Sequence, residues 1–195
     1  MKLIVITSPS FLENEAKAIS TLFEEGLEIL HLRKPEASAN EIRRLLDSIP
    51  AVYHPHIVTH DHFELLNDYD LMGIHLNRRN PQVPALHTGS VSCSCHSLDE
   101  VKQRKDYCQY VFLSPIYNSL SKPGYKAEFQ LDELTEAAQN RIIDAKVMAL
   151  GGISIHHLQE VKNIGFGGAV LLGDVWKHQV NELPDYFHLL KQQII

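Results

Sequence analysis

Short apolar runs, many of them β-branched, alternate with amphipathic stretches along the whole chain. In the stretch 14–25, Ala16, Ile19, Leu22 and Phe23 recur at three- and four-residue spacing, the period of a helix with one buried face. Strands are expected at residues 3–7, 29–32, 56–59, 73–76, 89–94, 110–113, 146–150 and 169–172. Helices are expected over 14–25, from Ser38, over 63–67, from Ser97, and over 131–140, 155–164 and 185–192.

Eight strand–helix units predict a compact (β/α)8 TIM barrel of the α/β class. Strands joined by crossover helices run parallel, and eight of them can close into a barrel. The 195 residues lie just under the roughly 200-residue lower limit of that fold, so short helices are expected. Without a linker-like segment, we expect a single domain over 1–195. A doubly wound open sheet is the alternative. Against it, the first strand is followed by SPSFLEN and not by a glycine-rich dinucleotide fingerprint.

Charge and cysteine content exclude several classes of partner. The formal net charge of −6 argues against a broad nucleic-acid or anionic-membrane surface. No apolar run approaches the roughly 20 residues of a membrane helix, and the start MKLIVITSPS does not look like a signal peptide. We therefore expect a cytoplasmic protein whose three cysteines, at positions 93, 95 and 108, are reduced. A homo-oligomer is compatible with the sequence, which does not determine the oligomeric state.

Polar side chains gather where the expected strands end. In a barrel these carboxyl ends carry the active site. Because side chains alternate along a strand, His31 and Arg33 share one face, and His31 is a candidate substrate-binding residue. Ser92, Ser94 and His96 likewise share a face. If these polar faces point into the barrel, the intervening leucines and cysteines pack beneath the helices.

Glycine turns after the last two strands suggest an anion site. Gly151-Gly152 precedes a helix, and Gly173 follows the eighth strand. Glycine lets backbone N–H groups approach a phosphate closely, and barrels often build their phosphate site from these two loops. A simple tight turn that needs positive φ is the competing interpretation.

Two basic side chains suit a diphosphate. Arg33 offers a planar fork and Lys122 a mobile charge, and Ser119 and Ser121 could donate to the same oxygens. The competing interpretations are a structural ion pair for Arg33 and a solvated loop charge for Lys122.

Asp61 and His96 are the remaining candidates for chemistry. Asp61 directly follows the third strand and suits a metal ligand or a partner for a ring nitrogen, although an aspartate there could also cap the next helix. His96 could shuttle a proton. The 12 histidines form no HExxH or paired-ligand spacing, so a zinc site is not expected.

Six segments, in this order, resemble the thiamine phosphate synthase and thiazole tautomerase (TenI-like) superfamily, a group of TIM barrels. They are His31-Leu32-Arg33-Lys34, Thr59-His60-Asp61, Gly73-Ile74-His75-Leu76, and residues 94–100, 114–122 and 149–153. The resemblance covers nearly the whole chain.

The resemblance implies an enzyme of thiamine biosynthesis that joins hydroxymethylpyrimidine diphosphate to thiazole phosphate and releases diphosphate. Its partners would be these small phosphorylated substrates. Carried over by position, Asp61 would hold Mg²⁺ and Ser94 would lie near the pyrimidine. The turns at Gly151-Gly152 and Gly173 would hold the thiazole phosphate. The diphosphate would be bound by Arg33, Lys122, Ser119 and Ser121.

The chain departs from the synthase pattern at several positions. Pro35 stands where the pattern has a lysine, His60 replaces an asparagine, and Asn80 replaces a second acidic metal ligand. A neutral ligand weakens the attraction for Mg²⁺. His31 in place of glutamine resembles the tautomerase branch, where His96 would catalyse an isomerisation of carboxythiazole phosphate. A non-catalytic thiazole-phosphate-binding barrel is a third alternative.

Overall fold

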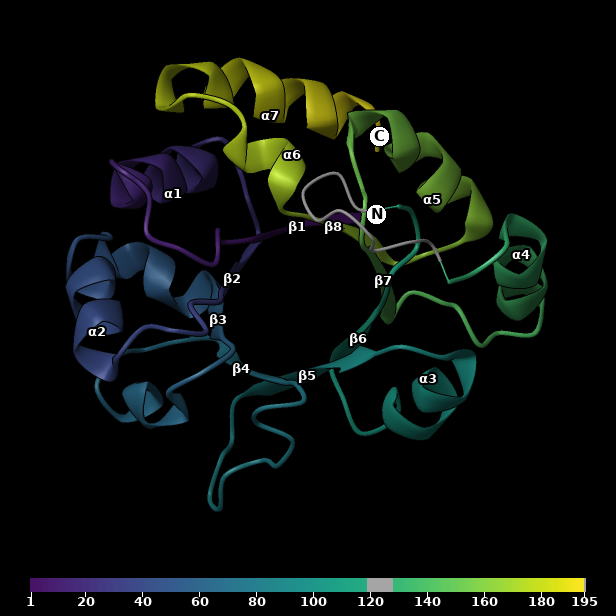
Figure 1. The fold of residues 1–195 in the computed structure, drawn as a ribbon, viewed down its shortest axis with the longest axis horizontal. Coiled ribbons are helices and arrows are strands. Elements are labelled where there is room, and N and C mark those ends of the chain that lie inside the picture. The colour runs from purple at the N-terminus through teal and green to yellow at the C-terminus, as the bar shows by residue number, and fades with distance from the viewer. Residues whose placement is uncertain (119–127, 195) are drawn as a thin grey trace.

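The computed structural model describes residues 1–118 and 128–194. It contains a closed ring of eight parallel strands in the order β1-β2-β3-β4-β5-β6-β7-β8 (Figure 1). The strands are β1 (Lys2–Ile6), β2 (Ile29–Leu32), β3 (Ile57–Thr59), β4 (Gly73–Leu76), β5 (Ser90–Cys95), β6 (Tyr110–Leu113), β7 (Val147–Leu150) and β8 (Gly168–Leu171). The barrel prediction is confirmed. The open-sheet alternative is wrong because β1 pairs with both β2 and β8.

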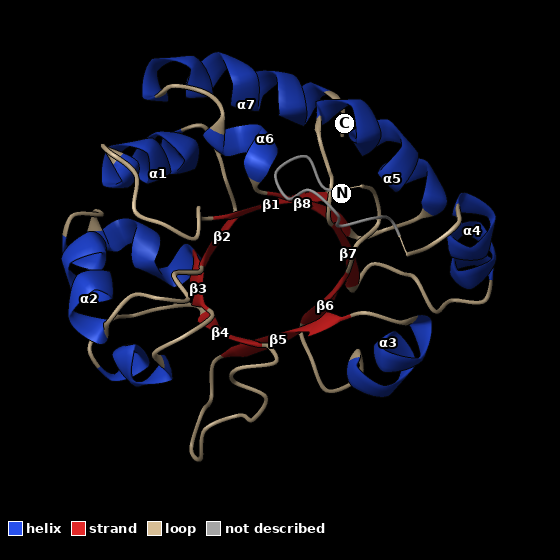
Figure 2. Cartoon of the chain, viewed as in Figure 1, coloured by secondary structure: helices blue, strands red, loops and turns tan. Residues whose placement is uncertain are grey.

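Helices surround this ring on the outside (Figure 2). The α-helices are α1 (Glu15–Glu24), α2 (Ala39–Asp47), α3 (Leu98–Arg104), α4 (Leu131–Gln139), α5 (Leu158–Ile164), α6 (Gly173–Trp176) and α7 (Leu183–Gln192). The 3-10 helices are η1 (Ala51–His56), η2 (Phe63–Asn67), η3 (Ile155–His157) and η4 (Val180–Glu182). The chain stays this short because β4 is followed by a loop and several helices have only one or two turns.

Local sequence signals explain where two of the helices begin. The Ser38 side chain accepts from the Glu41 backbone N–H, and the Glu41 carboxylate accepts from the Ser38 N–H, which makes a capping box for α2. Ser97 caps α3 by accepting from the Glu100 N–H at 3.1 Å. The sequence did not predict α6, a single turn directly after β8. It also predicted one continuous helix over 155–164, whose first turn is 3-10 in the structure.

The barrel separates two apolar clusters. One lies between strands and helices and includes Leu30, Leu32, Cys93 and Cys95. The other lies inside the ring and includes Ile4, Ile6, Ile29, Val58, Tyr110, Phe112, Met148 and Val170. The predicted alternation of faces is therefore confirmed. The three cysteines are buried thiols, with the Sγ atoms of Cys93 and Cys108 3.6 Å apart. Within the described ranges, no helix has the length and apolar character needed to span a membrane.

Candidate active site

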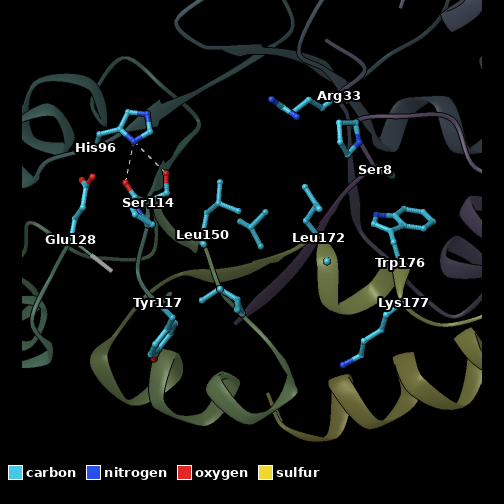
Figure 3. A pocket seen from close by; sticks show the side chains of 17 residues that line it. Ser8, Arg33, His96, Ser114, Tyr117, Glu128, Leu150, Leu172, Trp176 and Lys177 are labelled. Carbon is cyan, nitrogen blue, oxygen red and sulfur yellow. Dashed lines mark hydrogen bonds between the residues drawn. The ribbon is translucent and has the colours of Figure 1, made fainter. Parts of the chain in front are cut away.

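A pocket of about 670 Å³ opens at the carboxyl ends of the strands. Its volume falls in the range of small-molecule sites, roughly 300–1,000 Å³. The pocket brings together five of the residues proposed from sequence: Arg33, His96, Gly151, Gly152 and Gly173. Figure 3 shows Arg33 and Ser8 on one side and His96 with Ser114 on the other, with Leu150 and Leu172 between them. Ser119, Ser121 and Lys122 lie outside the described residues.

The turn after β7 requires its two glycines. Gly151 and Gly152 have φ of +100° and +67°, a region that side chains disfavour. A Cβ on Gly152 would lie 2.3 Å from the Asn118 carbonyl oxygen. The loop after β6 is held here by the Tyr117 N–H, which donates to the Gly151 carbonyl at 2.9 Å. The tight-turn interpretation is therefore correct, and the anion-site interpretation stays a prediction for the same turn.

Arg33 reaches the pocket from the end of β2. Its backbone N–H donates to Thr7 Oγ1 at 2.9 Å, and the Thr7 hydroxyl donates to the Arg33 carbonyl at 3.1 Å. Thr7 therefore fixes where the arginine leaves the strand. The next residue, Lys34, turns away from the pocket and forms a buried ion pair with Glu15 at 2.6 Å. Burial lowers the pKa of Lys34 and raises that of Glu15.

His96 is held in one tautomer. Its Nδ1 lies 3.1 Å from the Ser114 carbonyl oxygen (Figure 3). Because a carbonyl only accepts, Nδ1 carries the hydrogen, and in the neutral ring Nε2 keeps its lone pair. The Glu100 carboxylate accepts from the His96 backbone N–H at 2.7 Å and anchors the residue at the end of β5. His96 therefore has the form of a general base.

Sequence reasoning missed several residues that line the pocket, among them Glu128, Trp176 and Lys177. The indole N–H of Trp176 donates to the Ile6 carbonyl at 2.6 Å. Lys177 pairs with the buried Asp174. Trp176 is the last residue of α6 and Lys177 follows it directly, so recognising a helical turn after the eighth strand would have found both.

Two predicted substrate-binding residues, His31 and Ser94, are not part of the lining of this pocket. His31 is fully buried inside the barrel, where Nε2 lies 2.7 Å from the Tyr110 hydroxyl. Ser94 Oγ lies 2.9 Å from His75 Nε2. The structure therefore places both in the polar interior of the ring, and their role toward substrate stays a prediction.

Asp61 does not fit the predicted magnesium site as the side chains stand. Its Oδ1 accepts from Arg79 Nη2 and from Asn80 Nδ2, each at 2.9 Å, and its Oδ2 accepts from Arg79 Nη2 at 3.0 Å. A guanidinium thus already neutralises the Asp61 carboxylate, and the amide of Asn80 stands where a second acidic ligand is expected. A hard cation such as Mg²⁺ must be coordinated by these carboxylate oxygens. To bind here it would have to displace Arg79.

Fold and site together define a class: a closed (β/α)8 barrel with a small-molecule-sized pocket at the carboxyl ends of its strands. Residues 3–175 match the family model described as thiamine monophosphate synthase. The chain belongs to this family.

Named relatives agree with the match. A crystal structure of thiamine phosphate pyrophosphorylase from Bacteroides thetaiotaomicron is 51% identical with a TM-score of 0.90, and the match covers 99% of this chain and 97% of that one. The thiamine-phosphate synthase of Caldivirga maquilingensis is 25% identical over 183 residues, covering 87% of this chain and 86% of the relative. A thiamine phosphate pyrophosphorylase from Pyrococcus furiosus, 18% identical with a TM-score of 0.80 and covering 99% and 95% of the two chains, shares the fold.

Proposed function

We propose that this chain is a transferase that makes thiamine phosphate by joining hydroxymethylpyrimidine diphosphate to thiazole phosphate, with release of diphosphate. The observation that carries the proposal is that Arg33 and the glycine turns after β7 and β8 all line the same pocket. The names of the relatives, above all the 51% identical structure, support the same reaction.

The proposed chemistry needs mainly clamping and neutralisation. Departure of the diphosphate leaves a cationic pyrimidine that the thiazole nitrogen attacks, so the protein must hold both substrates in line and stabilise the charge that develops on the leaving group. Arg33 would bind the diphosphate with its planar fork, joined by Lys122. Backbone N–H groups at Gly152 and Gly173 would hold the thiazole phosphate. No step is assigned to a metal ion.

The direct test is synthesis of thiamine phosphate by the purified protein, with and without Mg²⁺. The thiamine phosphate formed is oxidised to a fluorescent product and measured by its fluorescence. We expect product above a blank without enzyme. We also expect Arg33→Met to lower kcat/KM by about two to three orders of magnitude, the typical effect of removing one charge-stabilising donor. Absence of product under both conditions would exclude the synthase.

The tautomerase reaction is a second candidate because of His96. An isomerisation of carboxythiazole phosphate needs one group that removes and returns a proton, and His96, whose Nδ1 is engaged by the Ser114 carbonyl, leaves Nε2 for this task without a metal. His96→Gln should abolish tautomerisation. Lys122→Ala should lower synthase activity by orders of magnitude and leave tautomerisation nearly unchanged, since only the synthase develops diphosphate charge. Tight binding of thiazole phosphate without either turnover would indicate the non-catalytic alternative.

A further inference from the structure

Three histidines from neighbouring strands meet inside the barrel. They are His31 on β2, His60 directly after β3 and His75 on β4, with exposed fractions of 0%, 4% and 0%. One ring nitrogen from each lies within 4.8 Å of those of the other two. Neither the proposed synthase reaction nor the tautomerase reaction assigns a step to this cluster.

The rings are held in the form that binds metals. Burial, reinforced by Arg33, lowers the pKa of His75 to about 3. Burial and the neighbouring histidines also hold the pKa values of His31 and His60 well below the ordinary 6.5. All three imidazoles are therefore neutral near pH 7, and a neutral imidazole nitrogen is a good ligand for Zn²⁺ and its neighbours in the first transition row.

Outer hydrogen bonds resemble those around a metal centre. Metal-binding histidines usually engage their second nitrogen with a nearby polar group, which orients the ring. His31 Nε2 lies 2.7 Å from the Tyr110 hydroxyl, while its Nδ1 faces His60 Nε2 at 2.8 Å. His75 Nδ1 lies 2.8 Å from Ser92 Oγ. Two of the three rings are therefore each held from behind by a hydroxyl group. His75 Nε2 also lies 2.9 Å from Ser94 Oγ, and Ser94 has to give up this contact when His75 binds an ion.

We propose that His31, His60 and His75 form a binding site for one imidazole-preferring divalent transition-metal ion, of which Zn²⁺ is the type. Around a tetrahedral ion with bonds of 2.0–2.1 Å, ligand nitrogens stand roughly 3.4 Å apart. The closest pair of ring nitrogens has to move slightly apart, and the most distant pair has to approach by about 1–1.5 Å. Small side-chain rotations supply both movements. The fourth ligand would be a water or a hydroxide. The positive charge of Arg33 favours the negatively charged hydroxide.

The test uses the full chain, stripped with a chelator and titrated with Co²⁺ alone. Cobalt reports geometry, since four-coordinate Co²⁺ absorbs visible light strongly and hexa-aqua Co²⁺ does so weakly. We expect one strongly absorbing ion per chain, displaced by Zn²⁺. His60→Gln, at the rim of the cluster, should abolish the strong spectrum. The matched control His188→Gln, exposed on α7, should retain it.

A second variant separates the cluster from adventitious binding and from a folding defect. Tyr110→Phe keeps all three ligands and removes only the hydroxyl behind His31, so it should weaken Co²⁺ binding roughly 10–100-fold. Circular dichroism would show that it remains folded. A weak spectrum in the unmodified protein, or a strong one unaffected by His60→Gln, would overturn the proposal. Because the readout is spectroscopic, it holds or fails independently of the proposed transferase activity.

Discussion

At the residue scale, single atoms decide which side chains the pocket tolerates. The clearest case is Gly152, because a Cβ there would meet backbone atoms of Tyr117 and Asn118, which cannot rotate away. Gly165 offers a comparison, since it also has positive φ, at +107°, but a Cβ there would have only the Ala138 Cβ nearby, at 3.7 Å.

We predict that Gly152→Ala destabilises the protein much more than Gly165→Ala. The Gly165 variant suffers only the left-handed backbone conformation, at about 1 kcal/mol. The Gly152 variant adds a clash that moves the loop after β6. Its free energy of unfolding should fall by several kcal/mol, and its affinity for thiazole phosphate should be lost. Urea denaturation and calorimetric titration measure the two effects. Equal losses in both variants would contradict the role given to the Asn118 contact.

Asp61 is the second residue-scale case, because Arg79 takes up both of its oxygens. We predict that the unmodified chain does not bind Mn²⁺, a spectroscopic substitute for Mg²⁺, through Asp61. Arg79→Ala should create such binding by freeing the carboxylate. Electron paramagnetic resonance measures free Mn²⁺, with Asp61→Asn as the control. Mn²⁺ binding by the unmodified chain that Asp61→Asn removes would show that Arg79 yields to the metal.

At the element scale, α6 depends on a buried carboxylate. Asp174 accepts from the Ile155 N–H at 3.0 Å, from Lys177 and from the Tyr186 hydroxyl. It thereby joins the turn after β8 to η3 and to α7. Burial alone would raise the pKa of Asp174, but these three donors outweigh it, so the pKa lies below 3.8.

We predict that Asp174→Asn lowers the free energy of unfolding by about 2 kcal/mol at pH 7, the usual cost of losing hydrogen bonds to a charged group. A depressed carboxyl pKa gives stability that is present above the unfolded-state value and lost as the pH falls through the folded-state value. The difference between variant and unmodified protein should therefore shrink below about pH 4. Denaturation at pH 7 and pH 3 tests this, with the exposed Asp106→Asn as control. A difference that does not change with pH would contradict it.

At the scale of the whole molecule, the pocket exists only because the barrel closes. Its lining comes from loops after strands at both ends of the sequence, and Trp176 reaches across to the Ile6 carbonyl, 170 positions away. A ligand that touches so many elements should stabilise the entire fold.

We predict that thiazole phosphate at about 100 times its Kd raises the free energy of unfolding by about 2.7 kcal/mol. Arg33→Met should leave this effect largely intact, because Arg33 is assigned to the diphosphate. Gly173→Val should reduce it, because Gly173 lies on the proposed phosphate loop. Thermal or urea unfolding with and without ligand measures the shift. The same shift in both variants would contradict the division of the pocket into two anion sites.

Much of the fold and part of the site could be predicted from sequence because they depend on local signals. The strand period places His31 and Arg33 on the inner face, the serine caps start α2 and α3, and the glycine pair marks the turn after β7. Each signal lies within a few residues, where backbone sterics and side-chain alternation decide the outcome.

The sequence by itself determined the eight-unit barrel, its inner and outer faces and the family to which the chain belongs. Only the tertiary structure decided which polar groups meet. It paired Asp61 with Arg79 and brought together His31, His60 and His75, whose scattered positions match no metal motif. The physical reason is that closing a parallel barrel sets distant strand ends side by side at hydrogen-bond distance, and no local periodicity encodes which side chains then face one another.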